Sequence, residues 1–171
     1  MTPCEFLEEV AHPNMVQALE EPDSKLRIIN AIMSLDALAG IIYTYGSSIK
    51  DPAISAFKSD TKFRDNLAEI SHSFKVLRDT AFSIKHGELT HDKPRLVRSV
   101  GSIQERINGF GLFRLGDEIG GSVVVIEYDP GPGYMRASSA VADTYRMLRR
   151  IVEGGPAETD EHDDRPGEVD E

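Results

Sequence analysis

Apolar residues recur every three or four positions over most of the first 86 residues, the spacing that places them on one face of an α-helix. Capping residues and helix-stopping residues divide this stretch into four helices, and the same spacing returns near residue 145. We therefore expect helices at about residues 3–21, 24–45, 60–70, 73–86 and 138–152.

The first of these helices carries its own start signal and an internal break. Thr2 and Glu5 stand at the spacing of a capping box, and Pro3 suits the first helical position. Pro13 lacks a backbone N–H and disfavours a helical conformation at the residue before it. We therefore expect a kink near Pro13.

The stretch of residues 24–45 is apolar around most of its helical circumference, the pattern of a helix at the centre of a bundle. Asp36 interrupts this pattern. A buried carboxylate needs a cationic partner, because otherwise it takes up a proton. We therefore predict a structural ion pair of Asp36 with Arg78 or Lys85. Exposure of Asp36 to solvent and a catalytic role are the alternatives.

The sequence period changes after residue 90, where short alternating or β-branched segments replace the helical pattern. Glycines and a Pro/Gly-rich turn at residues 129–133 separate these segments. We expect a small antiparallel sheet whose last strand turns back on the strand before it. The expected strands are residues 95–100, 111–115, 122–128 and 134–136.

The composition suits one globular domain with a polar tail. Among 171 residues, 40% are hydrophobic, one is Cys and 14 are Gly, which excludes collagen-like and disulfide-rich proteins. Residues 154–171 hold eight acids and one base, a net charge of −7, so the other 153 residues carry only −3 of the total of −10. We expect an α+β fold: a four- to five-helix bundle at residues 1–153 with the antiparallel sheet inserted before the last helix, at about 95–136, and a disordered acidic tail at 154–171.

Two features bear on location. The N-terminus lacks the basic region of a secretory signal. The most apolar run, residues 28–45, contains Asn30 and Asp36, so we do not expect it to span a membrane. We expect a cytoplasmic protein that makes no contact with a membrane.

The most distinctive segment is the helix that ends near residue 86. Its core-facing stripe leaves four ionisable residues on the other side of the helix: Arg78, Asp79, Lys85 and His86. This pattern is typical of a solvated face, with Lys85 and His86 complementing the helix C-terminus. A phosphate or RNA site and a dimer interface are the alternatives.

The arrangement of Arg78-Asp79 followed by Lys85-His86 resembles a group of small uncharacterised bacterial proteins and, more remotely, the HEPN superfamily of helical bundles. Many HEPN domains are metal-independent RNases whose site forms at a dimer interface from an Arg, the polar residue after it and a downstream His. The resemblance implies that Arg78, Asp79 and His86 form such a site. His86 would then exchange protons with the ribose hydroxyl or the leaving oxygen, and Arg78 would stabilise the phosphorane.

The spacing of Arg78 and His86 adds a condition to that interpretation. Eight residues of helix separate them by about 12 Å of rise. One chain is therefore not expected to place both side chains on one phosphate. A two-fold partner would have to supply one of them.

Residues 85–98 form the most basic window of this acidic chain. The window suits a phosphate group, and an ordinary exposed loop is the alternative, because no aromatic residue is interleaved for base stacking. The candidate phosphate-binding residues are Lys85, His91, Lys93, Arg95 and Arg98. Since His86 and His91 lack a convincing third ligand and no nucleotide-binding motif is present, we expect no metal and no cofactor.

These observations leave two functions open. We expect a small accessory or interaction protein without a catalytic signature, whose partner is a second copy of the chain or another protein. The alternative is a HEPN-like metal-independent RNase, acting as a toxin or defence component on RNA through Arg78 and His86.

Overall fold

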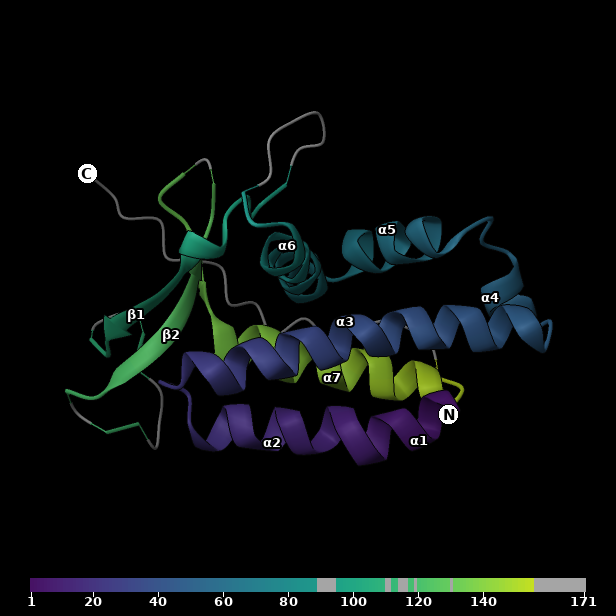
Figure 1. Cartoon of the computed structure of the whole chain (residues 1–171), viewed down its shortest axis with the longest axis horizontal. Coiled ribbons are helices and arrows are strands. Elements are labelled where there is room, and N and C mark those ends of the chain that lie inside the picture. Colours follow the sequence, from purple (N-terminus) through teal and green to yellow (C-terminus); the bar gives the residue numbers. More distant parts are fainter. Residues whose placement is uncertain (89–94, 110–111, 114–116, 119, 130, 156–171) are drawn as a thin grey trace.

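The computed structural model describes residues 1–88, 95–109, 112–113, 117–118, 120–129 and 131–155 of the chain (Figure 1). Its helices and strands follow in an order that confirms the α+β prediction, with the sheet placed before the last helix. The elements are α1 (Pro3–Phe6), a π-helical turn (Leu7–Ala11), α2 (His12–Glu20), α3 (Lys25–Ser48), α4 (Pro52–Ser55), α5 (Asp60–Ile70), α6 (His72–His86), a 3₁₀ turn (Val100–Ser102), β1 (Ile103–Ile107), β2 (Ser122–Glu127), β3 (Tyr134–Arg136) and α7 (Ala137–Val152).

Helix α3 lies at the centre of the bundle, as its all-round apolar sequence predicted. It packs against α2, α6 and α7, and α5 lies along its far half (Figure 1). Its inward side chains, such as Ile32, Leu35 and Leu38, are fully buried and meet Phe74 of α6 and Leu148 of α7 in one core cluster. Burial of this apolar surface is the main stabilising term of the fold.

The break expected near Pro13 takes the form of a π-helical turn. The capping box at the start of α1 is present, with the Glu5 N–H donating to Thr2 Oγ1 over 3.2 Å. The turn Leu7–Ala11 then widens the helix, and the His12 N–H donates to the carbonyl of Leu7, five residues back. Such a turn accommodates the missing donor of Pro13, because the helix resumes beyond it in a new register.

The sheet has the order β1-β2-β3 with both pairs antiparallel. β2 and β3 match the expected strands at 122–128 and 134–136, and Ile126 pairs with Met135. The strand predicted at 95–100 is wrong: β1 pairs with β2 instead, and residues 95–99 form no strand. The strand expected at 111–115 lies mostly outside the described residues.

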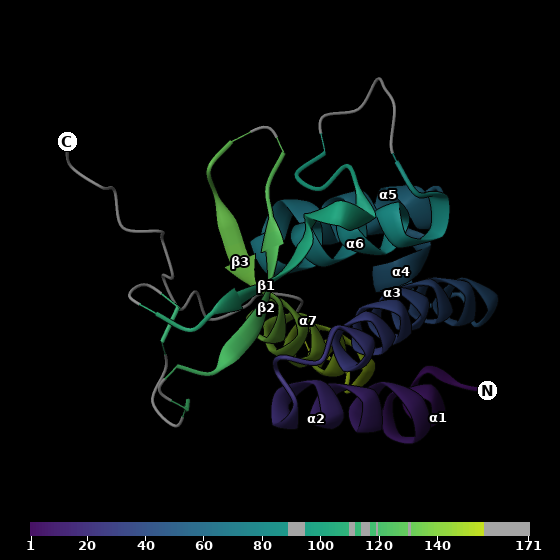
Figure 2. The same ribbon diagram turned by 60° about the vertical axis from the view of Figure 1, so that its left-hand side comes forward.

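The sheet stands at one end of the bundle, where β3 runs directly into α7 (Figure 2). β2 is buried on both faces: Val124 and Ile126 join the bundle core, while Val123 and Val125 form a small second cluster with Leu112. The loop between α2 and α3 also reaches the sheet, since the Val124 N–H donates to the carbonyl of Pro22 over 2.8 Å.

The last described residues close α7. Gly154, at φ +80°, and Gly155 donate their N–H groups to the carbonyls of Ile151 and Arg150, the two bonds of a Schellman motif. These two glycines therefore belong to the helix cap. The disordered tail expected at residues 154–171 lies outside the described residues from Pro156 onward.

Helix α3 is long and apolar enough to cross a membrane by length and composition alone. Half of its most apolar 18-residue window is buried inside the fold, and the central helix of a globular bundle passes the same test. The absence of membrane contact stays a prediction.

Candidate functional site

Asp36 accepts hydrogen bonds from two cations that reach it from two different helices. Its Oδ1 accepts from Arg64 Nη1 of α5, and its Oδ2 accepts from Lys85 Nζ of α6 over 2.5 Å. Asp36 itself is only 4% exposed. Arg64 is held in place by Asp60, whose two carboxylate oxygens lie 2.9 and 3.0 Å from its Nε. The expected ion pair of Asp36 therefore forms with Lys85, and Arg64 is a second partner that the sequence did not indicate.

Arg78 does not reach Asp36, so this part of the predicted pairing is wrong. Its Nη1 donates to Asp65 Oδ1 over 2.9 Å and to the carbonyl of Arg64 over 3.1 Å. The reason is axial position, because Arg78 precedes Lys85 by seven residues, or about 10 Å of helical rise. That offset places Arg78 beside α5 rather than beside the middle of α3. Arg78 thus ties α6 to α5.

Asp79 is buried, contrary to the solvated face that the helical pattern indicated. Only 1% of it is exposed. Its Oδ1 accepts from Arg95 Nη1 over 3.1 Å, and its Oδ2 accepts from the Leu96 N–H over 2.9 Å. The segment at residues 95–99 lies across this side of α6 and is anchored by the fully buried Val97. Asp79 therefore fastens an irregular segment onto the helix.

His86, the last residue of α6, is exposed. Its ring lies against the ring of Phe82, with the centroids 4.3 Å apart. The Arg95 guanidinium also lies on Phe82, 4.0 Å from the ring centroid. The positive charge grouped with His86 around this ring is therefore that of Arg95, while Arg78 lies with α5.

Two of the candidate phosphate-binding residues are held by carboxylates of the bundle. Lys85 is paired with Asp36 and Arg95 with Asp79, while Arg98 is exposed. His91 and Lys93 lie outside the described residues.

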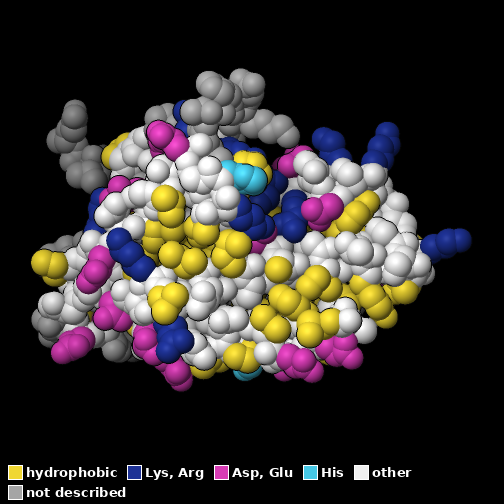
Figure 3. All heavy atoms as spheres, viewed as in Figure 1, with side chains coloured by type: hydrophobic (Ala, Val, Ile, Leu, Met, Phe, Trp, Pro, Cys, Tyr) yellow, Lys and Arg dark blue, Asp and Glu magenta, His cyan; other side chains and the backbone are white. Residues whose placement is uncertain are grey.

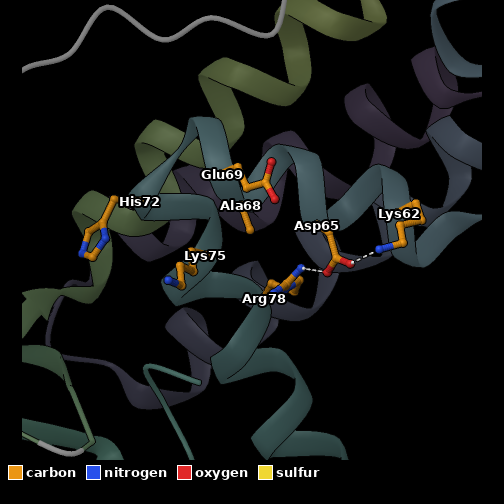
Figure 4. A pocket seen from close by; sticks show the side chains of 7 residues that line it. All are labelled: Lys62, Asp65, Ala68, Glu69, His72, Lys75 and Arg78. Atoms are coloured by element: carbon orange, nitrogen blue, oxygen red, sulfur yellow. Dashed lines mark hydrogen bonds and ion pairs between the residues drawn. The ribbon is translucent and has the colours of Figure 1, made fainter. Parts of the chain in front are cut away.

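A hollow of about 450 Å³ opens between α5 and α6 (Figure 4). Its α5 wall carries the acids Asp65 and Glu69, and its α6 wall carries the bases Lys75 and Arg78 (Figure 4). The other lining residues are Lys62, Ala68 and His72. Because acids oppose bases across the hollow, it presents no strong field of either sign. The histidine that shares this hollow with Arg78 is His72, not His86.

His72 lies where α6 meets the sheet. Its Nε2 is 2.9 Å from the hydroxyl of Tyr128, and the two rings meet edge to face. Burial, together with the charge of Lys75, lowers the pKa of His72 below its usual value, so its neutral form is favoured. Burial also raises the pKa of Tyr128 to about 12. The pair therefore forms a neutral hydrogen bond near neutral pH.

A second feature is the outward face of α3, whose exposed and partly exposed residues we call the α3 band. Between residues 28 and 49 the only charged residue is Asp36, which points into the bundle. Leu26 is 64% exposed and Tyr45 39% exposed. Apolar side chains accordingly gather over α3 in the space-filling view (Figure 3). The band consists of Leu26, Ile29, Asn30, Met33, Ala37, Gly40, Ile41, Thr44 and Tyr45.

The apolar residues of the α3 band are visible in the sequence, but there they indicate a fully buried helix rather than a partly exposed one. An all-round apolar helix predicts burial on all sides. In the structure α3 is covered on several sides, by α2, α6 and α7 and also by α1, the turn Leu7–Ala11, α4 and α5. The remaining apolar side is the surface that this fold leaves unpartnered within the described chain.

Among the described residues, no three His, Cys, Asp or Glu side chains gather as metal ligands. No protein-family model, curated protein or solved structure matches the chain. The resemblance to HEPN domains therefore remains an expectation drawn from the Arg78 to His86 segment.

Proposed function

We propose that this chain is a non-catalytic accessory or interaction protein of the cytoplasm, acting as a homodimer. The observation that carries the proposal is that three charged side chains of α6 form ion pairs with other parts of the fold. Arg78, Asp79 and Lys85 each have a partner inside the fold: Asp65, Arg95 and Asp36 respectively. The three charges that set this helix apart in the sequence therefore stabilise the arrangement of α3, α5 and α6.

The requirements of RNA cleavage support the same proposal. A catalytic Arg must be free to contact a phosphate as charge develops on it. Arg78 would have to give up Asp65, and Asp79 would have to leave a site where it is 1% exposed. Breaking the buried pair of Asp79 with Arg95 is costly, because it leaves the Asp79 charge without compensation. Two of the three residues that the RNase alternative needs, Arg78 and Asp79, are thus committed elsewhere.

The test combines a cleavage assay with a mass measurement. Purified protein should cleave single-stranded RNA no faster than its His86→Ala variant. The mass in solution at micromolar concentration should be that of two chains, 2 × 18.9 = 37.8 kDa. Cleavage that is lost in both the Arg78→Lys and the His86→Ala variants would contradict the non-catalytic proposal, and a monomer would contradict the homodimer.

One observation supports a second candidate function. His72, Lys75 and Arg78 line the same hollow of one chain, and the neutral form of His72 is favoured. A neutral imidazole can accept a proton from a ribose hydroxyl, and the ammonium of Lys75 can stabilise charge on a phosphate, while Arg78 stays paired with Asp65. If the chain cleaves RNA through this hollow, activity should be lost in His72→Ala and retained in His86→Ala. The reverse result would return the activity to the HEPN-like pair of Arg78 and His86.

A further inference from the structure

We propose that the hollow between α5 and α6 binds a small zwitterion of the amino-acid class, held by Glu69 at its ammonium group and by Lys75 at its carboxylate. The inference goes beyond the proposed interaction function, because it gives the chain a small-molecule ligand. It does not depend on a homodimer, since the residues that line the hollow belong to one chain.

Most of the charge that lines the hollow is already paired. Asp65 accepts a hydrogen bond from Arg78 over 2.9 Å, and Lys62 Nζ lies 3.8 Å from the same carboxylate (Figure 4). The side chain of Lys62 is 69% exposed, so water also screens its charge. His72 is bonded to the Tyr128 hydroxyl through Nε2, and its neutral form is favoured. These groups therefore leave little charge for a ligand to neutralise.

Glu69 and Lys75 are the two charges of the hollow that remain. Glu69 belongs to the α5 wall and is exposed, whereas Lys75 belongs to the α6 wall and is half-buried. Within the described part of the chain neither side chain forms a hydrogen bond or an ion pair, and Figure 4 shows no bond to either. Their charged atoms therefore lie farther apart than the ~4 Å of an ion pair. The hollow thus separates an unpaired acid from an unpaired base.

This arrangement selects a ligand that carries both charges. A simple anion bound to Lys75 would face the carboxylate of Glu69 across the hollow, and a simple cation bound to Glu69 would face the ammonium of Lys75. Like charges at short range repel each other. A zwitterion places its ammonium against Glu69 and its carboxylate against Lys75, so both contacts are charge-assisted hydrogen bonds. Such a ligand is neutral overall, which suits a hollow without a strong field of either sign.

The size and the lining of the hollow suit such a molecule. Its volume of about 450 Å³ lies within the roughly 300–1,000 Å³ of small-molecule sites. Packed helices lie about 8–10 Å apart, and an amino acid with one charge-assisted bond of about 2.8 Å at each end spans a gap of that order. Among the described residues that line the hollow only Ala68 is apolar, so the site favours a polar ligand over an apolar one.

The first experiment is an NMR titration of the full-length chain labelled with ¹⁵N. Glycine, β-alanine and γ-aminobutyrate carry the same two charges at increasing separation, and the common L-amino acids are screened beside them. We expect at least one amino acid to shift the amide signals of residues 62–78 with a Kd in the millimolar range or below. Acetate and methylammonium should each bind about tenfold more weakly, because each makes only one of the two charged contacts.

The second experiment tests the two contacts separately. Glu69→Gln and Lys75→Gln each remove the charge from one wall and leave a polar side chain. Each should raise the Kd of the best ligand about tenfold or more. Glu20→Gln and Lys58→Gln are the matched controls, because both residues are exposed and lie outside the hollow, so the Kd should not change. The dispersion of the amide signals checks that each variant is folded.

Three outcomes would overturn the proposal. The first is that no amino acid shifts these signals at about 50 mM, a concentration well above a millimolar Kd. The second is that binding of the amino acid survives Glu69→Gln or Lys75→Gln, or is matched by acetate or methylammonium, because a single charge would then suffice. The third is that inorganic phosphate or a short single-stranded RNA binds more tightly than any amino acid and depends on Lys75 but not on Glu69. The hollow would then be an anion site, as RNA cleavage through His72 requires. None of these outcomes changes the mass in solution, so the homodimer is judged separately.

Discussion

Removal of the Asp36 carboxylate is the change that most directly tests the ionic network of the bundle. Asp36→Ala deprives Arg64 and Lys85 of a shared acceptor that is only 6% exposed in its side chain. Hydrogen bonds to charged groups contribute about 1.5–3 kcal/mol each, and breaking a buried ion pair costs about 3–5 kcal/mol.

The expected cost lies at the lower end of that range. Arg64 keeps its bonds to Asp60, and Lys85 is 43% exposed and therefore free to hydrate. We expect Asp36→Ala to lower the free energy of unfolding by about 3 kcal/mol. Asp36→Asn keeps the shape and one oxygen acceptor, so it should cost about 2 kcal/mol.

The assay is urea unfolding followed by circular dichroism, with all variants at one protein concentration because the proposed dimerisation would contribute to stability. With an m-value of about 2 kcal/mol/M, the midpoint of Asp36→Ala should fall by about 1.5 M at an unchanged slope. Asp60→Ala is the matched control: Asp60 is 45% exposed, and its loss should cost less than about 1 kcal/mol.

Two results would refute this reasoning. A cost below about 0.5 kcal/mol for Asp36→Ala would place its carboxylate in solvent. Equal losses of unfolding free energy in Asp36→Ala and Asp60→Ala would mean that burial does not make the Asp36 carboxylate a more stabilising partner of Arg64 than the Asp60 carboxylate.

Three further predictions concern other parts of the fold, and a fourth concerns the tail. Gly46→Ala should destabilise the protein by about 1–3 kcal/mol in the same assay, because the new Cβ would lie 2.7–2.9 Å from three atoms of Ile54. Because the folded-state pKa of His72 is lowered from 6.5, stability should fall as the pH drops below 6.5 and through that lower pKa, and His72→Gln should flatten the decline in melting temperature. Tyrosinate absorbance should reveal one group that titrates near pH 12 and is absent in Tyr128→Phe. The stability that the neutral Tyr128 phenol contributes to the fold should be fully present below pH 10 and lost as the pH rises through about 12. Removal of residues 156–171 should leave the melting temperature within about 2 °C, since a polar tail buries little surface; a larger drop in differential scanning calorimetry would show that the tail docks.

Local signals in the sequence predicted the helices well, because caps and stops act over three or four residues. Ser24 caps α3 and Ser59 caps α5, close to the boundaries expected from their sequences. β1 carried no such signal. Its residues after Ile103 are exposed, so no alternation marks it, and its strand conformation comes from pairing with β2.

In the candidate site, too, the contacts between different elements could not be predicted from the sequence. The helical pattern of α6 placed Asp79 on the polar side, but burial of that side depends on the segment at residues 95–99, which returns over the helix. The partnership of Asp36 with Arg64 joins residues 28 positions apart on separate helices. Periodicity within one element indicates which face a residue occupies. It does not indicate which other element covers that face.

The central place of α3 has a consequence for synthesis of the chain. Its principal partner α7 begins at residue 137, which is 137 − 48 = 89 positions after the end of α3. At translation rates of about 5–20 residues per second, α3 waits roughly 5–20 s on the ribosome before α7 is made. Throughout that interval the side of α3 that α7 covers is open to chaperones that hold unfolded chains. Protease resistance of stalled nascent chains should therefore appear in a single step, once α7 has left the ribosome, rather than helix by helix.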